Sequence, residues 1–153
     1  MPSTSTRAVA HDSFTIERDF DFPPEQMFAA FASREAKASW FGGMEGCKDD
    51  IRQMDFRVGG SERVRVLWPG GKISDFSAYY HDIVDGERIV YSYAMKLNEV
   101  PISVSLATIE FKPHGSGTRL VLTEQGAFLD GFEDKGSREQ GTRTLLDRLA
   151  AAL

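Results

Sequence analysis

Apolar and polar residues alternate along much of the chain, which is the pattern of half-buried β-strands. Short turns with glycine, such as Pro69-Gly70-Gly71 and Asp85-Gly86, separate several of these runs. The pattern predicts about seven strands, and the short connections predict that successive strands pair antiparallel. The expected strands are residues 14–20, 51–58, 62–68, 72–84, 88–96, 102–112 and 118–125.

Helical spacing appears after the first of these runs and again at the end of the chain. Pro23-Pro24-Glu25 suits the start of one short helix, and Ser33 suits the cap of a second over residues 34–40. The helical spacing over residues 132–153 predicts a long final helix. Leucines at core spacing occupy its second half: Leu145, Leu146, Leu149 and Leu153. The order predicts an α+β domain, with two short helices after the first strand and a curled antiparallel sheet wrapped on the C-terminal helix.

Length and composition favour one domain with its own core. The chain has 153 residues, of which 41% are hydrophobic and 11% aromatic. We expect a flexible tail over residues 1–12 and a single domain over residues 13–153. The net charge of −5 argues against a nucleic-acid partner. No apolar run is long enough for a membrane span, and no secretion signal is evident, so a cytoplasmic location is expected.

Metal and thiol chemistry receive no support from the sequence. Cys47 is the only cysteine, which excludes an internal disulfide and a cysteine-cluster metal site. His11, His81 and His114 lie far apart and lack the spacing of metal ligands. We therefore predict neither a metal nor a cofactor.

The first half of the final helix offers little side-chain bulk. Almost no bulk is offered there by Gly136, Ser137, Gln140, Gly141 and Thr144. Glycine within a helix costs about 1 kcal/mol relative to alanine, so two glycines need a physical reason. One reason is a cavity between the helix and the sheet. The alternative is that the helix starts after Gly136 and that Gly141 lets another backbone approach closely.

The alternation of side chains along the last predicted strand places one carboxylate, that of Glu124, near the same part of the final helix. Leu120, Leu122 and Glu124 share a strand face, so buried leucines place Glu124 inside as well. A buried carboxylate needs a partner, for which Arg138, Arg143, a tyrosine hydroxyl or water is available. We predict that a ligand is bound by Trp40, Phe41, Met54, Trp68, Phe76, Tyr80, Tyr91, Tyr93, Glu124, Phe128 and Gly141. The same aromatic residues are compatible with a solid core.

No catalytic constellation is recognisable, so whether the protein is an enzyme stays open. Burial raises the pKa of a carboxyl group, and a raised pKa suits acid–base chemistry on an enolisable ketone. Glu124 is the best candidate for a catalytic residue. A tyrosine hydroxyl, from Tyr80, Tyr91 or Tyr93, would then polarise the carbonyl group.

Several blocks, in order and spacing, point to a known family. They are residues 16–25 leading to Trp40-Phe41-Gly42, residues 57–60, 87–91 and 117–120, and residues 123–131 followed by 138–142. Together they resemble the START-like (SRPBCC) superfamily, and within it the bacterial branch named after the activator of the heat-shock-protein-90 ATPase. The resemblance implies a helix-grip fold, often with a cavity between sheet and helix. Relatives in the superfamily bind lipids, hormones or polyketides, and some are cyclases.

Three functional hypotheses follow. The first is a binding protein for a small apolar or aromatic molecule, and the second is an enzyme acting on such a molecule. The third is a chaperone-type adaptor. The eukaryotic co-chaperone carries an additional N-terminal domain for which this chain has no space, so a chaperone partner is not expected. A homodimer is compatible with the sequence, because the edge strands of such a sheet favour cover.

Overall fold

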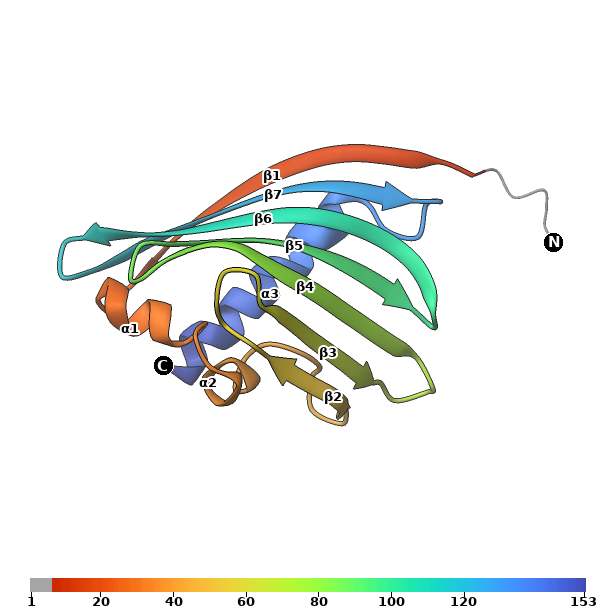
Figure 1. The fold of residues 1–153 in the computed structure, drawn as a ribbon, viewed down its shortest axis with the longest axis horizontal. Helices are drawn as coiled ribbons and strands as arrows, with labels where there is room; N and C mark the ends of the chain where they lie inside the picture. Colours follow the sequence, from red (N-terminus) through yellow and green to blue (C-terminus); the bar gives the residue numbers. More distant parts are fainter. Residues whose placement is uncertain (1–6) are drawn as a thin grey trace.

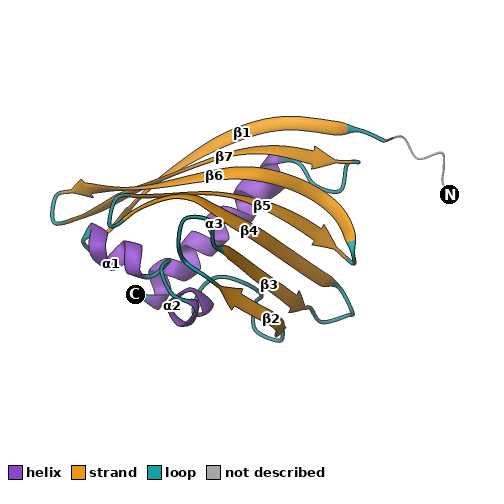
Figure 2. Cartoon of the chain, in the orientation of Figure 1, coloured by secondary structure: helices purple, strands orange, loops and turns teal. Residues whose placement is uncertain are grey.

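The computed structural model describes residues 7–153 and shows one antiparallel sheet that curves around three helices (Figure 1). The strands are β1 (Val9–Phe20), β2 (Lys48–Met54), β3 (Ser61–Leu67), β4 (Ile73–Val84), β5 (Arg88–Leu97), β6 (Val100–His114) and β7 (Gly117–Leu129). The helices are α1 (Pro24–Ala29), α2 (Arg34–Ala38) and α3 (Lys135–Ala152). All three lie on the concave side of the sheet (Figure 2).

The topology confirms the predicted α+β helix-grip fold. The strand order is β1-β7-β6-β5-β4-β3-β2, so β2 to β7 form a meander and β1 pairs with the last strand. Each short connection joins antiparallel neighbours, as the turn pattern predicts. Gly70, Gly71 and Gly86 have positive φ angles, which explains why glycine occupies these turns.

The first strand starts earlier than the sequence pattern predicts. β1 begins at Val9, which pairs with Leu129 of β7, so residues 9–12 belong to the sheet and not to a tail. The side chains of residues 9–13 are all exposed, and this stretch therefore lacks the alternation that marks a half-buried strand. Residues 1–6 of the expected tail lie outside the described residues.

The hydrophobic core fills one end of the space between sheet and helices. Met27 and Phe28 of α1 and Leu146 and Leu149 of α3 are buried there against the sheet. The indole N–H of Trp40 donates to the carbonyl of Ala30 at 3.0 Å, which joins the two short helices. The C-terminal half of α3 therefore anchors the helix, as its leucine spacing predicts.

The N-terminal half of α3 is helical from Lys135 onward, so Gly136 and Gly141 both lie within the helix. Asp134 and Ser137 form a capping box that fixes this start. A Cβ atom added at Gly141 would meet no atom within 4 Å. The alternative reading of Gly141, a close backbone approach, is therefore wrong, and the space beside it is open.

Candidate functional site

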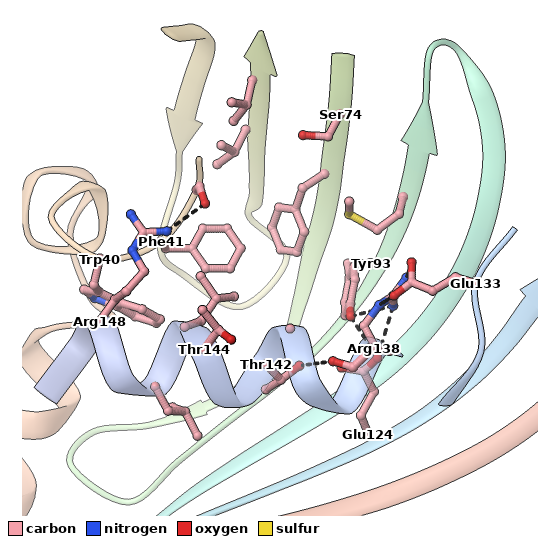
Figure 3. A pocket seen from close by; sticks show the side chains of 18 of the residues that line it. Trp40, Phe41, Ser74, Tyr93, Glu124, Glu133, Arg138, Thr142, Thr144 and Arg148 are labelled. Atoms are coloured by element: carbon pink, nitrogen blue, oxygen red, sulfur yellow. Dashed lines mark hydrogen bonds and ion pairs between the residues drawn. The ribbon is translucent and has the colours of Figure 1, made fainter. Parts of the chain in front are cut away.

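A pocket of about 510 Å³, partly open to solvent, lies between α3 and the concave face of the sheet; Figure 3 shows side chains that line it. Its wall combines residues of α2, the loop after it, strands β3 to β7, and α3. The volume falls in the range of small-molecule sites, which is roughly 300–1,000 Å³. The pocket exists because α3 contacts the sheet mainly at β1, which leaves the middle strands uncovered beside Gly141.

The structure brings eight of the predicted ligand-binding residues to this pocket. They are Trp40, Phe41, Trp68, Phe76, Tyr91, Tyr93, Glu124 and Gly141. These residues lie in the loop after α2 and in β4, β5, β7 and α3, except Trp68, which directly follows β3. Residues distant in sequence thus meet at one surface, since the meander places their strands side by side.

Three predicted residues do not line the pocket. Met54 ends the edge strand β2 and packs against the core cluster near α1. Tyr80 is buried beside Phe56, with ring centroids 5.1 Å apart, and so belongs to the same core. Phe128 points inward, but the guanidinium of Arg138 stacks over its ring at 5.4 Å and covers it. The two-residue alternation along a strand predicts which side chains face the inside of the sheet. It does not predict which side chain from another element packs against each of them.

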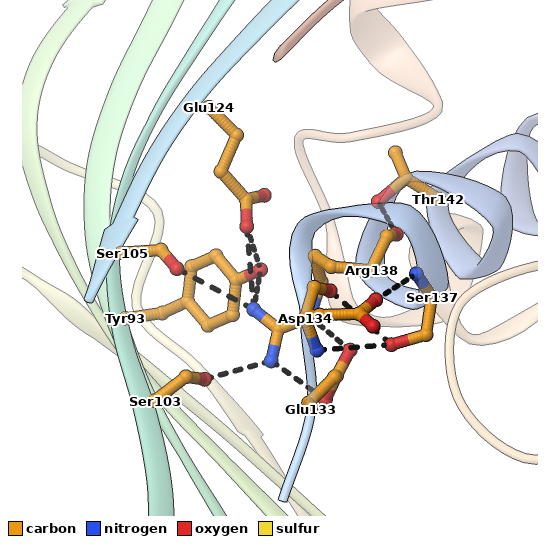
Figure 4. Close-up of polar contacts among 9 residues, drawn as sticks. All are labelled: Tyr93, Ser103, Ser105, Glu124, Glu133, Asp134, Ser137, Arg138 and Thr142. Carbon is orange, nitrogen blue, oxygen red and sulfur yellow. Dashed lines mark hydrogen bonds and ion pairs between the residues drawn. The ribbon is translucent and has the colours of Figure 1, made fainter. Parts of the chain in front are cut away.

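A buried polar network closes one end of the pocket (Figure 4). Nη1 of Arg138 lies 3.2 Å from Oε2 of Glu124, and the Tyr93 hydroxyl donates to the same oxygen at 2.8 Å. Arg138 also donates to the Tyr93 hydroxyl at 2.9 Å and to Ser103 at 2.7 Å. Glu124 is therefore buried with two of the partners that the sequence offered, an arginine and a tyrosine hydroxyl.

The electrostatics of this network stabilise its charged groups. Nε and Nη2 of Arg138 donate to the two oxygens of Glu133 at 2.8 and 3.0 Å. Burial works against the charge of Arg138, but the hydrogen bonds to Glu133 and the nearby carboxylates hold its pKa above the ordinary value. Burial and the charge of Glu124 raise the pKa of Tyr93, so its hydroxyl stays protonated and donates. Glu124 thus accepts hydrogen bonds from two fixed donors, which favours a structural role over proton transfer.

Arginines also fix the other end of the pocket. Arg148 of α3 donates to the carbonyls of Gly42 and Gly43 at 3.0 and 2.9 Å, and Arg52 donates to that of Phe41 at 2.7 Å. Three successive carbonyls of the loop after α2 are thereby held. Figure 3 shows Arg148, Trp40 and Phe41 at one end of the helix and Arg138, Glu124 and Tyr93 at the other.

Two further buried residues were not identified from the sequence. Lys37 of α2 and Glu62 of β3 form an ion pair with Nζ and Oε1 2.7 Å apart. Lys37 itself lines the pocket. Glu62 shares its strand face with Val64 and Val66, so alternation contained a signal for its burial. No comparable signal marks Lys37, which is one lysine in a five-residue helix.

Residues 7–153 contain neither a helix suited to crossing a membrane nor a cluster of metal-ligand side chains. No helix in this range combines the length and the apolar character needed to cross a bilayer. Within the same residues, no cluster of three or more His, Cys, Asp or Glu side chains is arranged to hold a metal ion.

Comparison with solved structures finds relatives of the same length and fold. A protein from Rhizobium leguminosarum is 41% identical with a TM-score of 0.91, and the match covers 96% of this chain and 97% of that one. The Mll3558 protein from Rhizobium loti is 44% identical with a TM-score of 0.86, covering 95% and 99% of the two chains. The CV1439 protein from Chromobacterium violaceum is 26% identical with a TM-score of 0.76, covering 91% and 94%.

Comparison with curated proteins finds no match. The family model described as Activator of Hsp90 ATPase homolog 1-like protein matches residues 21–153, which include α1, α2, β2 to β7, α3 and the whole pocket wall. The chain therefore belongs to the family of Activator of Hsp90 ATPase homolog 1-like proteins.

Proposed function

We propose that this protein binds a small molecule with an apolar, aromatic or planar body in the pocket between α3 and the sheet. The observation that carries the proposal is a continuous aromatic wall along a cavity of about 510 Å³. Ring centroids lie 4.9 Å apart between Phe41 and Phe76, 4.9 Å between Phe76 and Tyr93, and 5.9 Å between Tyr91 and Tyr93. Such a wall offers a planar ligand both apolar burial and ring contacts.

The pocket is also built to stay open. Gly141 and Thr144 present little bulk toward it, and the arginine contacts at both ends hold its frame in place. A pre-formed pocket lowers the cost of ordering side chains when a ligand binds. This supports binding of a guest molecule over a purely structural use of the space.

The same geometry gives less support to the two alternative functions, an acid–base enzyme and a chaperone-type adaptor. An acid–base enzyme would need a carboxyl group free to exchange protons with the substrate, whereas Glu124 is engaged by Tyr93 and Arg138. A chaperone-type adaptor does not require a cavity of this size. We therefore favour a carrier or sensor of the small molecule.

A tryptophan at the open position of α3 tests the proposal. Gly141→Trp fills the pocket, and Gly136→Trp is the matched control, because Gly136 lies on the same helix and does not line the pocket. The neutral fluorescent probe N-phenyl-1-naphthylamine is titrated into each protein, and thermal unfolding checks that each is folded. We expect the wild type and Gly136→Trp to bind the probe and Gly141→Trp to lose at least tenfold in affinity. Equal binding by folded Gly141→Trp, or no binding by the wild type, would overturn the proposal.

A further inference from the structure

A second buried polar group lies on the pocket wall, apart from the Arg138 network. Nζ of Lys37 lies 2.7 Å from Oε1 of Glu62, and the side chains are 4% and 2% exposed. The hydroxyl of Tyr80 donates to the same oxygen at 2.6 Å. One carboxylate oxygen therefore accepts both hydrogen bonds, and the ion pair as a whole carries no net charge.

The ammonium group of Lys37 has donors beyond the one that Glu62 takes. A lysine ammonium carries three N–H groups. Within residues 7–153, Glu62 provides the one hydrogen-bond acceptor of Nζ. The other neighbours are aromatic rings, with Nζ at 4.5 Å from the centroid of Phe41, 5.7 Å from Tyr91 and 5.8 Å from Phe76. These three rings and Lys37 all line the pocket.

Stability alone is a weak reason for such a pair. Replacing a buried ion pair by packed apolar residues is often neutral or stabilising, because both charges lose their hydration. A buried ammonium also gains when its remaining N–H groups find acceptors. Lys37 lies on the pocket wall among the rings that a planar ligand would touch, so its remaining N–H groups are close to where such a ligand would bind.

We propose that Lys37 donates a hydrogen bond to an uncharged oxygen acceptor of the bound molecule, so that the ligands are aromatic or planar compounds with a carbonyl or hydroxyl group. This inference rests on the proposed function of the pocket. An uncharged oxygen suits the site because Glu62 already neutralises Lys37. A carboxylate would bring a second negative charge beside Glu62, which is unfavourable in a buried site.

Two probes of nearly equal shape separate the hydrogen bond from apolar burial. 2-Acetylnaphthalene carries a carbonyl acceptor, and 2-ethylnaphthalene carries none. Calorimetry measures both with the wild type, with Lys37→Met/Glu62→Gln, and with Lys96→Met, which removes an exposed lysine outside the pocket. The double variant leaves no unpaired buried charge. We expect the preference for the ketone over the hydrocarbon to fall about tenfold or more in the double variant, the factor of one hydrogen bond to a charged donor. Lys96→Met should match the wild type.

A second double variant provides an independent test in case the first does not fold, and it tests whether another donor at position 37 restores the preference for the ketone. Lys37→Gln/Glu62→Gln keeps an amide donor at position 37 and should retain part of the preference for the ketone. An unchanged preference in both folded double variants would overturn the role of Lys37 while leaving the pocket intact. If 2-naphthoate, and not the ketone, depends on Lys37, the assignment of an uncharged acceptor is wrong. If the wild type binds neither naphthalene, the proposed function itself fails.

Discussion

Arg138 in the first turns of α3 and Glu124 in β7 face each other across the end of the pocket, with Nη1 3.2 Å from Oε2. Their side chains are 9% and 4% exposed, so water screens the pair little. Together with the stacking of Arg138 over the ring of Phe128, the contact joins the half of the helix that has small side chains to the sheet. It thus explains how α3 stays in place over an open space.

Removal of the arginine should therefore destabilise the fold strongly. Arg138→Met leaves Glu124 buried without its cation, and we expect a loss of about 3–5 kcal/mol in the free energy of unfolding. Urea denaturation measures it. The double variant Arg138→Met/Glu124→Gln should lose less than the sum of the two single variants, because the two side chains interact directly. Additive losses would show that the pair contributes no coupling.

Part of this network can be predicted from the sequence, because side chains alternate between the two faces of a strand. Leu120 and Leu122 are buried, and the two-residue period of a strand carries Glu124 to the same side. The cap of α2 was also readable, since Ser33 accepts from the amide of Ala36 at 3.1 Å. Local patterns thus fixed which face is inside. They did not fix which distant side chains would meet there.

The residues that sequence reasoning misplaced show this limit. Tyr80 and Phe128 are inside as predicted, but neighbours from distant segments, Phe56 and Arg138, cover them. The sequence does not indicate that Lys37 is buried, because a lysine in a short helix is ordinarily exposed and its burial depends on Glu62, 25 residues away. Contacts of this kind arise from the topology of the sheet, which no periodicity encodes.

Two glycines of the pocket wall should respond oppositely to alanine. Gly141 is helical and open at its Cβ position, so Gly141→Ala should raise the free energy of unfolding by about 1 kcal/mol. Gly42 has φ of +131°, and a Cβ atom there would lie 2.5 Å from Nη2 of Arg52, so Gly42→Ala should destabilise the protein. Chemical denaturation compares both with the wild type. A destabilised Gly141→Ala would mean that the helix is packed at this point.

Acid should weaken one ion pair on the outer side of the sheet. The bidentate hydrogen bonds of Arg63 hold the pKa of Asp75 below its ordinary value of 3.8. As the pH falls, the Asp75 carboxyl group is protonated in the unfolded chain before it is protonated in the folded protein. The stabilisation is therefore complete above about pH 5 and is lost as the pH falls through 3.8 toward the pKa of Asp75 in the folded protein. Asp75→Asn should therefore be less stable than the wild type at pH 7, with the difference shrinking at pH 3.5. Urea midpoints at the two pH values test this, and a difference that stays constant contradicts it.

Alkaline titration should ionise Tyr80, Tyr91 and Tyr93, which face the inside of the sheet, only as the fold is lost. Burial raises the pKa of Tyr80, Tyr91 and Tyr93 above the ordinary value of 10.0. The stabilisation from their neutral hydroxyls is present below pH 10 and is lost as the pH rises further, because only the unfolded chain then ionises them. The absorbance of three phenolates at 295 nm should appear together with the loss of circular dichroism. Their ionisation in a folded protein would contradict their placement on the inside of the sheet.

The most direct measurement of the central claim is chemical-shift mapping of the ¹⁵N-labelled protein with N-phenyl-1-naphthylamine. The account predicts that the amide signals of Gly141, Thr142 and Thr144 on α3 and of Tyr93 on β5 move on titration. The signals of Val104 and Leu106, which are exposed and do not line the pocket, should stay in place. Shifts confined to Val104, Leu106 and their neighbours, with the α3 signals unmoved, would contradict a binding pocket under the helix.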